Sequence, residues 1–268
     1  MSGPYAEVIG DPIAQSKSPT IHNFWLAACG IAADYRACHV EAAGLADYLA
    51  VRRSDSDWRG CNVTMPHKQA VMPLLDRLDP LAARIGAVNT VVRAGDGALV
   101  GYNTDAAGFA EPLGARRFTA VSVIGAGGAA RAVLAALAAR GTSWVSLQNR
   151  SLAKGEALLA EFGLAGCVAL PGAEVRLAQL LVNTSLLGMA GFPPLPPVER
   201  GVSAGGLVYD IVTTPLDTAL LQAARARGLA TIDGLAMLIG QAGAAFALFF
   251  GQPAPREHDA ELRARIMA

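Results

Sequence analysis

A glycine-dense turn between an apolar run and a long Ala/Leu segment lies at the centre of the chain, in AVSVIGAGGAARAVLAALAARG (residues 120–141). The apolar run predicts a buried strand, and the Ala/Leu segment predicts a helix that ends at Gly141. Gly125, Gly127 and Ala130 fit the G-x-G-x-x-G/A pattern at the change from strand to helix. Backbone N–H groups and the helix dipole hold a pyrophosphate at such a turn, so the segment indicates a dinucleotide-binding fold. A glycine turn that only packs is the alternative.

Alternating strand and helix patterns fill much of the remaining chain. Short apolar runs predict strands at 6–10, 33–40, 59–65, 144–150, 179–185 and 206–212. Helical apolar spacing predicts helices over 21–30, 42–51 and 151–163. Two apolar runs around Asp96 and Gly97 predict a β-hairpin. The alternation favours an α/β fold, with a parallel sheet and right-handed crossovers in the second half.

Length and charge limit the class of protein. The 268 residues suggest two modest domains, because one domain commonly holds roughly 100–200 residues. Twenty-two Lys and Arg residues balance 22 Asp and Glu residues, so we expect no general attraction to a nucleic-acid backbone.

The termini and the cysteines give no sign of export, membrane insertion or metal binding. The N-terminus lacks the basic and apolar regions of a secretory signal. The apolar run 235–251 contains Gln241 and predicts a buried helix rather than a membrane span. Since no Cys-x-x-Cys pair or nearby His gives metal-ligand spacing, we expect no metal. Free thiols of a reducing cytoplasm are expected at Cys29, Cys38, Cys61 and Cys167.

The end of the predicted strand 144–150 indicates which dinucleotide binds. NAD-binding folds place an Asp or Glu near this position for the ribose 2′-hydroxyl, but this chain has Asn149 and Arg150. Arg150, followed by Ser151 and Lys154, suits a doubly charged 2′-phosphate. The pattern therefore predicts NADP, and an ordinary surface arginine is the alternative.

Two pairs of small polar residues, each two positions apart, occur in the first third: Ser16 with Ser18, and Asn62 with Thr64. Pro19 predicts an extended backbone at Ser18, so that both serine hydroxyls point the same way. Such pairs suit a small polyhydroxylated ligand, because each ligand hydroxyl needs a partner once water is removed. Ordinary turn and cap chemistry is the alternative.

Lysine is rare in this chain, occurring only at positions 17, 68 and 154. An amine can give up its proton and a guanidinium cannot, so Lys68 suits proton transfer. A solvent-facing surface lysine is the alternative. Asp105 either caps the helix that follows it or faces Lys68 and orients it.

Gln241 interrupts an apolar helical face that includes Met237, Ala244 and Leu248. A buried amide requires a hydrogen-bond partner. The pattern alone favours an internal hydrogen bond within the core.

Taken together, these segments closely resemble the shikimate dehydrogenase family, NADP-dependent enzymes that reduce 3-dehydroshikimate to shikimate in aromatic amino-acid biosynthesis. The resemblance covers nearly the whole chain, and several ordered motifs at compatible spacing make it specific. It rests on GDPIAQSKSPTIHN (10–23), NVTMPHK (62–68), GAVNT (86–90), GYNTD (101–105), IGAGGAAR (124–131), NRS with Lys154, and DGLAMLIGQA (233–242).

The resemblance implies an N-terminal α/β substrate domain over 1–103 and a Rossmann-type NADP-binding domain over 104–235, with C-terminal helices 236–268 packed onto the first. It implies that Lys68 and Asp105 form the catalytic pair. The implied substrate contacts are Ser16, Ser18, Asn62, Thr64, Asn89, Thr213 and Gln241. The implied NADP contacts are Gly125, Ala126, Gly127, Gly128, Ala129, Asn149, Arg150, Ser151, Lys154, Thr184 and Met237. We expect no metal, a small-molecule substrate, and a cytoplasmic monomer or homodimer.

Two positions depart from the family pattern. Thr213 stands where the family usually has a tyrosine that lines the substrate site, and Ala236 replaces a usual glycine. Loss of the phenol enlarges or rewires the pocket, so one alternative is a paralogue acting on quinate or another cyclic polyol. A second alternative is a non-catalytic NADP-binding regulator, but that role would require a broken catalytic pair, and both members are present.

Overall fold

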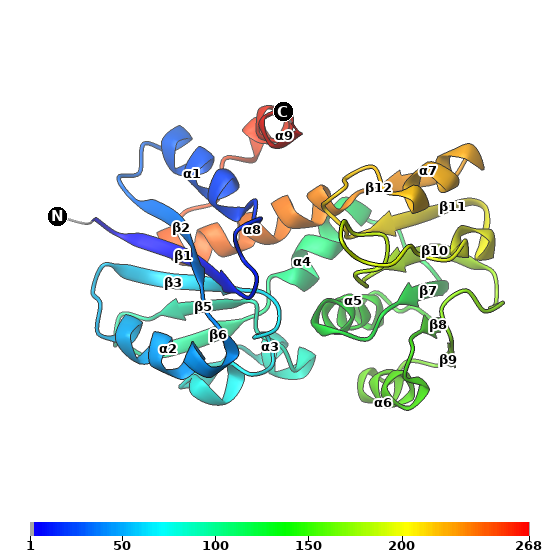
Figure 1. Cartoon of the computed structure of the whole chain (residues 1–268), viewed down its shortest axis with the longest axis horizontal. Helices are drawn as coiled ribbons and strands as arrows, with labels where there is room; N and C mark the ends of the chain where they lie inside the picture. The colour runs from blue at the N-terminus through cyan, green and yellow to red at the C-terminus, as the bar shows by residue number, and fades with distance from the viewer. Residues whose placement is uncertain (1–2, 268) are drawn as a thin grey trace. The chain divides into compact units, whose positions relative to one another are not determined.

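The computed structural model describes residues 3–267, which form two compact units. One unit runs to Gly108 and resumes at Ile239, and the other is Phe109–Leu238 (Figure 1). The first change of unit falls within helix α4 (Asp105–Ala110) and the second within helix α8 (Gly234–Phe250). The sequence-based boundaries, after residues 103 and 235, lie a few residues earlier in the chain.

The first unit is built on a six-stranded mixed sheet in the order β2-β1-β3-β5-β6-β4. Strand β1 pairs in parallel with β2 and β3, whereas β5 runs antiparallel to β3 and β6. The predicted hairpin is confirmed as β5–β6, and its turn places Gly97 at a φ of +81°. The strands are β1 (Tyr5–Gly10), β2 (Asp34–His39), β3 (Trp58–Val63), β4 (Arg77–Leu78), β5 (Thr90–Arg93) and β6 (Leu99–Tyr102).

Helices cover both faces of this sheet. Leu45 and Leu49 of α2 pack in one core cluster with residues of β1 and β3. On the other face, Trp25 of α1 meets Phe246 of α8 edge to face, with ring centroids 5.7 Å apart. The helices of this unit, besides parts of α4 and α8, are α1 (Ser18–Ala28), α2 (Leu45–Arg53), α3 (Pro80–Ile85) and α9 (Asp259–Met267).

The expected extended backbone at Ser18 is wrong. Ser18 is the first residue of α1, with Pro19 in the first turn. Proline is tolerated there because the N–H that it lacks has no partner within the helix anyway. The Ser16 hydroxyl accepts a hydrogen bond from the backbone N–H of Ser18 at 3.3 Å, which is the turn chemistry given above as the alternative.

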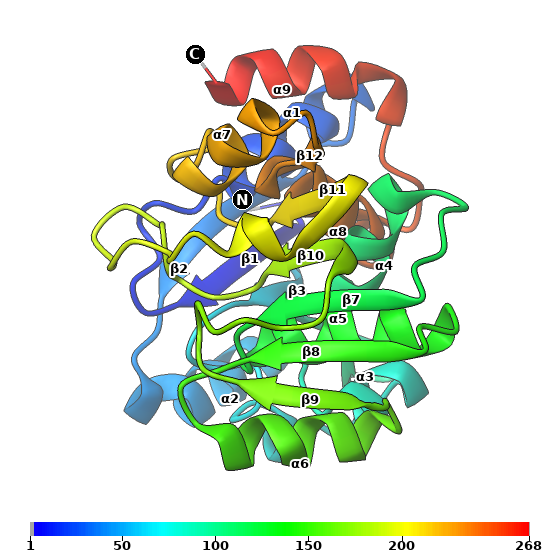
Figure 2. The same cartoon turned by 90° about the vertical axis from the view of Figure 1, so that its right-hand side faces the viewer.

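The second unit is an all-parallel sheet in the order β12-β11-β10-β7-β8-β9. Counted from β7, this is the 3-2-1-4-5-6 order of Rossmann folds, which confirms the predicted α/β class (Figure 2). The strands are β7 (Ala120–Ile124), β8 (Trp144–Gln148), β9 (Gly166–Ala169), β10 (Ala178–Asn183), β11 (Val202–Asp210) and β12 (Ala230–Ile232). The helices are α5 (Gly128–Ala139), α6 (Leu152–Phe162) and α7 (Ala219–Ala226), besides parts of α4 and α8.

Helix α8 contains the longest apolar stretch of the chain, and its interior residues Ala242, Ala245 and Phe246 are fully buried. Among residues 3–267, no helix has the length and apolar character needed to cross a membrane. All four cysteines are unpaired.

A histidine lies in the core of the first unit without a polar partner. His22 of α1 is fully buried, and neither ring nitrogen has a hydrogen bond. Its ring stacks on Tyr35 with centroids 4.0 Å apart and 4° between the planes. Burial disfavours the charged imidazolium and lowers the pKa of His22 to about 3.

This buried histidine makes stability depend on pH. The pKa of His22 is lower in the folded chain than in the unfolded one, so its contribution is complete above about pH 6.5 and is lost as the pH falls toward 3. We expect roughly 1.4 kcal/mol of unfolding free energy to be lost per pH unit in that window. Denaturant unfolding at pH 7.5, 6 and 5 measures this slope. In His22→Phe, the dependence of the unfolding free energy on pH should correspond to the uptake of one proton fewer on unfolding. An identical slope in both proteins would contradict the assignment.

Candidate active site

Lys68 and Asp105 form a close ion pair in the first unit. The Lys68 Nζ donates to Asp105 Oδ2 at 2.6 Å, and the two side chains are only 17% and 7% exposed. Lys68 follows β3, where its carbonyl accepts from the N–H of Val88 at 2.8 Å. Of the two alternatives for Asp105, orienting Lys68 is therefore the one seen. A lysine ammonium held by a carboxylate is a proton donor fixed in one place.

Asn89 holds the other carboxylate oxygen. Its Nδ2 donates to Asp105 Oδ1 at 2.8 Å and to Thr104 Oγ1 at 2.9 Å. Its Oδ1 accepts from the backbone N–H of Thr104 at 2.7 Å and from the Thr90 hydroxyl at 3.0 Å. Gln241 of α8 joins the same group, with its Oε1 3.5 Å from Asn89 Nδ2. The structure thus brings Lys68, Asp105, Asn89 and Gln241 into one largely buried polar network.

Asn62 extends this network along β3. Its Nδ2 donates to Thr90 Oγ1 at 3.0 Å and to the carbonyl of Asn89 at 3.3 Å. Thr64 follows β3, and its backbone N–H donates to the carbonyl of Ile9 at the end of β1. A side chain on Gly10 would come within 2.5 Å of the Thr64 methyl, so glycine is needed for this close approach.

Ser16 lies between β1 and α1, and Ser18, the first residue of α1, is buried. The carboxyl ends of the parallel strands β1 and β3 lie at the same edge of the sheet, so these serines and Thr64 follow neighbouring strand ends. No hydrogen bond joins either serine side chain to Lys68 or Asp105.

The glycine-dense turn of the second unit connects β7 to α5. Gly125 has a φ of +101°, and a Cβ there would come within 2.9 Å of Thr184 Oγ1. Thr184 lies beside it because its hydroxyl donates to the carbonyl of Ile124 at 2.6 Å. Gly127 is exposed, with no atom within 4 Å of the position that a Cβ would take. The turn therefore leaves its backbone and the start of α5 open to an anion, as a dinucleotide pyrophosphate requires.

A basic group follows the next strand. Arg150 is exposed two residues after β8, and Lys154 is exposed in the first turn of α6. Ser151 caps that helix by accepting from the Lys154 N–H at 3.4 Å, and Asn149 Nδ2 donates to the Ser151 carbonyl at 2.8 Å. This leaves the cations of Arg150 and Lys154 facing solvent at the strand end where a 2′-phosphate is expected.

Thr213 and Met237 are two further predicted contacts. Thr213 is half-buried in the segment after β11, and Met237 is buried in α8. Asp210 braces this region, because its carboxylate accepts from Asn183 Nδ2 at 3.0 Å and from the Thr218 hydroxyl at 2.7 Å. Burial raises the pKa of Asp210.

Sequence reasoning missed three members of the polar network in the first unit. Thr90 and Thr104 each donate a hydrogen bond to Asn89 Oδ1, and the Tyr35 hydroxyl donates to Asn62 Oδ1 at 2.6 Å. Both threonines stand inside the quoted motifs GAVNT and GYNTD, so their position was visible although their role was not. Tyr35 lies in an edge strand, where no sequence pattern marks it.

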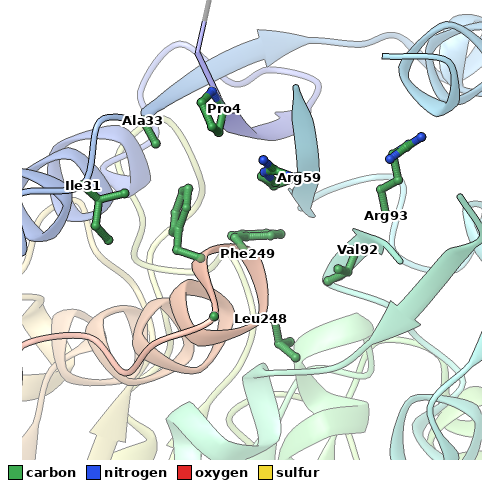
Figure 3. A pocket seen from close by; sticks show the side chains of 10 residues that line it. Pro4, Ile31, Ala33, Arg59, Val92, Arg93, Leu248 and Phe249 are labelled. Carbon is green, nitrogen blue, oxygen red and sulfur yellow. The ribbon is translucent and has the colours of Figure 1, made fainter. Parts of the chain in front are cut away.

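A cavity of about 440 Å³ lies elsewhere in the first unit (Figure 3). Its lining includes Arg59 at the start of β3, Arg93 at the end of β5, and Phe249 near the end of α8. Arg59 and Arg93 lie at one end of β3 and β5, and Asn62 and Asn89 lie at the other end of these two strands. None of the predicted site residues lines this cavity.

A Rossmann unit with an open glycine turn, in one chain with an α/β unit that holds a largely buried lysine–carboxylate pair, is typical of a nicotinamide-dependent oxidoreductase. Residues 8–91 match the family described as the shikimate dehydrogenase substrate binding domain. The chain is 56% identical over 269 residues to a shikimate dehydrogenase (NADP(+)) of Sphingopyxis alaskensis, covering 100% of this chain and 98% of that relative. The chain belongs to the shikimate dehydrogenase family, as its motifs predicted.

Solved structures agree with this assignment. A shikimate 5-dehydrogenase of Thermus thermophilus, in complex with NADP(H) and shikimate, is 38% identical, with a TM-score of 0.87 over 98% of this chain and 99% of that one. A quinate dehydrogenase of Corynebacterium glutamicum, in complex with NAD, is 30% identical, with a TM-score of 0.89 over 99% of this chain and 100% of that one. Both likenesses extend over both units.

Proposed function

We propose that the chain catalyses the reversible, NADP-dependent reduction of 3-dehydroshikimate to shikimate. The observation that carries the proposal is the largely buried Lys68–Asp105 pair at 2.6 Å, in a chain 56% identical along its length to a shikimate dehydrogenase (NADP(+)). The first unit would bind substrate and the second would bind NADP.

Lys68 and Asp105 would carry the proton chemistry. As the substrate carbonyl is reduced, the Lys68 ammonium gives its proton to the developing alkoxide, and in oxidation the amine takes it back. Asp105 keeps the amine in place, and its carboxylate accepts a charge-assisted hydrogen bond from a substrate hydroxyl. Asn89 fixes the carboxylate plane by donating to its second oxygen.

The polar residues at the strand ends would recognise the ring hydroxyls and carboxylate. We assign this role to Ser16, Ser18, Asn62, Thr64, Asn89, Thr213 and Gln241. Each is a small hydroxyl or amide group, and a polyhydroxylated acid requires one such partner for each polar atom that it buries.

The second unit would hold the dinucleotide. Bound NADPH supplies the hydride from its nicotinamide ring. The open backbone at Gly125 and Gly127 fits a pyrophosphate, and the cations of Arg150 and Lys154 fit a 2′-phosphate. Ser151 and Asn149 hold the loop that presents these cations.

Steady-state oxidation kinetics with purified protein test the proposal. Shikimate and quinate are offered in parallel, each with NADP and with NAD, and appearance of the reduced cofactor is followed by absorbance. We expect the largest kcat/KM with shikimate and NADP. No turnover of shikimate with either cofactor would overturn the proposal.

Thr213 decides how the quinate result is interpreted. The family's usual tyrosine is absent here, so the chain lacks a phenol that commonly lines the substrate site. If shikimate is preferred, Thr213 is a tolerated variation; if quinate is preferred, Thr213 marks a changed substrate pocket. Thr213→Tyr restores the tyrosine that is usual in the family and serves as the matched variant. We expect it to leave NADP binding unchanged.

We also propose that the protein acts in the cytoplasm as a monomer or homodimer. Four unpaired thiols support a reducing compartment. Light scattering coupled to size-exclusion chromatography measures the mass against the 27.6 kDa of one chain. A mass above two chains would contradict this assignment.

A further inference from the structure

Two residues of the 10–23 motif, His22 and Asn23, have no part in the proposed chemistry, yet both contact Tyr35. Tyr35 lies in β2, an edge strand whose outer N–H and C=O groups have no neighbouring strand. Asn23 of α1 satisfies both: its Nδ2 donates to the Tyr35 carbonyl at 2.7 Å and its Oδ1 accepts from the Tyr35 N–H at 2.9 Å. The backbone of Tyr35 is therefore fixed to helix α1.

The Tyr35 ring is held as firmly as its backbone. His22 stacks on it at 4.0 Å, and Phe249 of α8 packs against it with centroids 6.3 Å apart. Tyr35 is 1% exposed, and burial raises the pKa of its phenol well above the usual value. The hydroxyl therefore keeps its proton and acts as a donor.

The acceptor of that hydrogen bond is Asn62. The Tyr35 hydroxyl donates to Asn62 Oδ1 at 2.6 Å, while both Asn62 Nδ2 hydrogens are used by Thr90 Oγ1 and the Asn89 carbonyl. The Asn89 carbonyl can only accept, so the amide cannot be turned around. An amide oxygen has two lone pairs, and one of those on Asn62 has no partner among the described residues.

We infer that Tyr35 is a positioning residue that fixes the amide of Asn62, so that Asn62 meets the substrate with its oxygen and accepts a ring hydroxyl. Asn62 thereby selects a hydroxyl donor at that ring position and discriminates against an ether or a keto group. His22 and Asn23 hold Tyr35 in place. The inference deepens the proposed function and rests on it for the identity of the substrate.

Tyr35→Phe tests the inference, because it removes the hydroxyl and keeps the ring that stacks on His22. Without its donor, the Asn62 amide loses its fixed orientation. Since Asn62 contacts substrate in ground state and transition state alike, the loss appears in KM. We expect the KM for shikimate to rise about tenfold, with kcat within about twofold and the KM for NADP unchanged.

Tyr48→Phe is the matched control. The Tyr48 hydroxyl donates to the buried Glu7 carboxylate at 2.7 Å in the same unit, whereas the side-chain hydrogen bonds of Asn62 go to Tyr35, Thr90 and the Asn89 carbonyl. Loss of the Tyr48 hydroxyl should lower the melting temperature and leave the KM for shikimate unchanged. If Tyr35→Phe behaves in the same way, Tyr35 is only structural and the inference is overturned.

Hydrogen exchange of the Asn62 side-chain amide gives a readout that needs no turnover. In protein labelled with ¹⁵N-asparagine, we expect this amide to exchange at least about tenfold faster in Tyr35→Phe than in the unaltered chain or Tyr48→Phe. Equal exchange rates would overturn the positioning role. An unaltered chain that does not oxidise shikimate would overturn the proposed function instead, so the two failures are distinguishable.

Discussion

Replacing Lys68 by alanine should lower kcat for shikimate oxidation by about a thousandfold, while the dissociation constant for shikimate changes only a few-fold. A positioned acid–base group commonly contributes 10²–10⁴-fold to the rate, and no other amine lies in the described network to replace it. Steady-state kinetics give kcat, and calorimetric titration gives the dissociation constant.

Lys68→Arg is the matched control for this change. An arginine keeps the positive charge beside Asp105 but cannot give up its proton at neutral pH, so its kcat should also collapse. If Lys68→Arg retains near-normal turnover, Lys68 contributes charge rather than proton transfer. Near-normal turnover in Lys68→Ala would remove the residue from the reaction altogether.

Replacing Arg150 by aspartate should raise the KM for NADP about 100-fold and leave the KM for NAD within a few-fold. The arginine guanidinium would pair with the doubly charged 2′-phosphate of NADP, whereas an aspartate carboxylate would repel it. NAD has a hydroxyl at this position and is affected much less. Initial rates against each cofactor at saturating shikimate measure both constants.

Arg117→Asp makes the same change of charge at another exposed position of the second unit. It should leave the NADP to NAD preference unaltered, which separates a local contact from a general effect of net charge. An unchanged preference in Arg150→Asp would show that Arg150 is an ordinary surface residue.

The elements that sequence patterns predicted are those with a strong local signal. The glycine turn before α5 requires a positive φ at Gly125, and the β5–β6 hairpin requires one at Gly97, so glycine marks both. Strand β4, by contrast, has two residues, and helix α3 has six. Elements this short show no periodicity of their own and form because tertiary packing stabilises them.

The site divides in the same way. The chemistry of lysine indicated proton transfer at Lys68, and the family resemblance implied its pairing with Asp105. The choice between a cap and an orienting partner for Asp105 depended on side-chain direction. Thr104 and Tyr35 contribute hydrogen bonds to Asn89 and Asn62, which are distant from them in the sequence and close only in the folded chain. Ser18 was predicted wrongly because a Ser-Pro sequence has two local interpretations. The proline can follow an extended residue, or it can lie in the first turn of a helix, as Pro19 does here.

A crystal structure of the complex with shikimate and oxidised NADP would show whether Lys68 and Asp105 act on the substrate. We expect one ring hydroxyl of shikimate within hydrogen-bond distance of both Lys68 Nζ and the Asp105 carboxylate, with a second hydroxyl donating to Asn62 Oδ1. Shikimate bound away from Lys68 and Asp105, with both side chains still paired only to each other, would contradict this expectation.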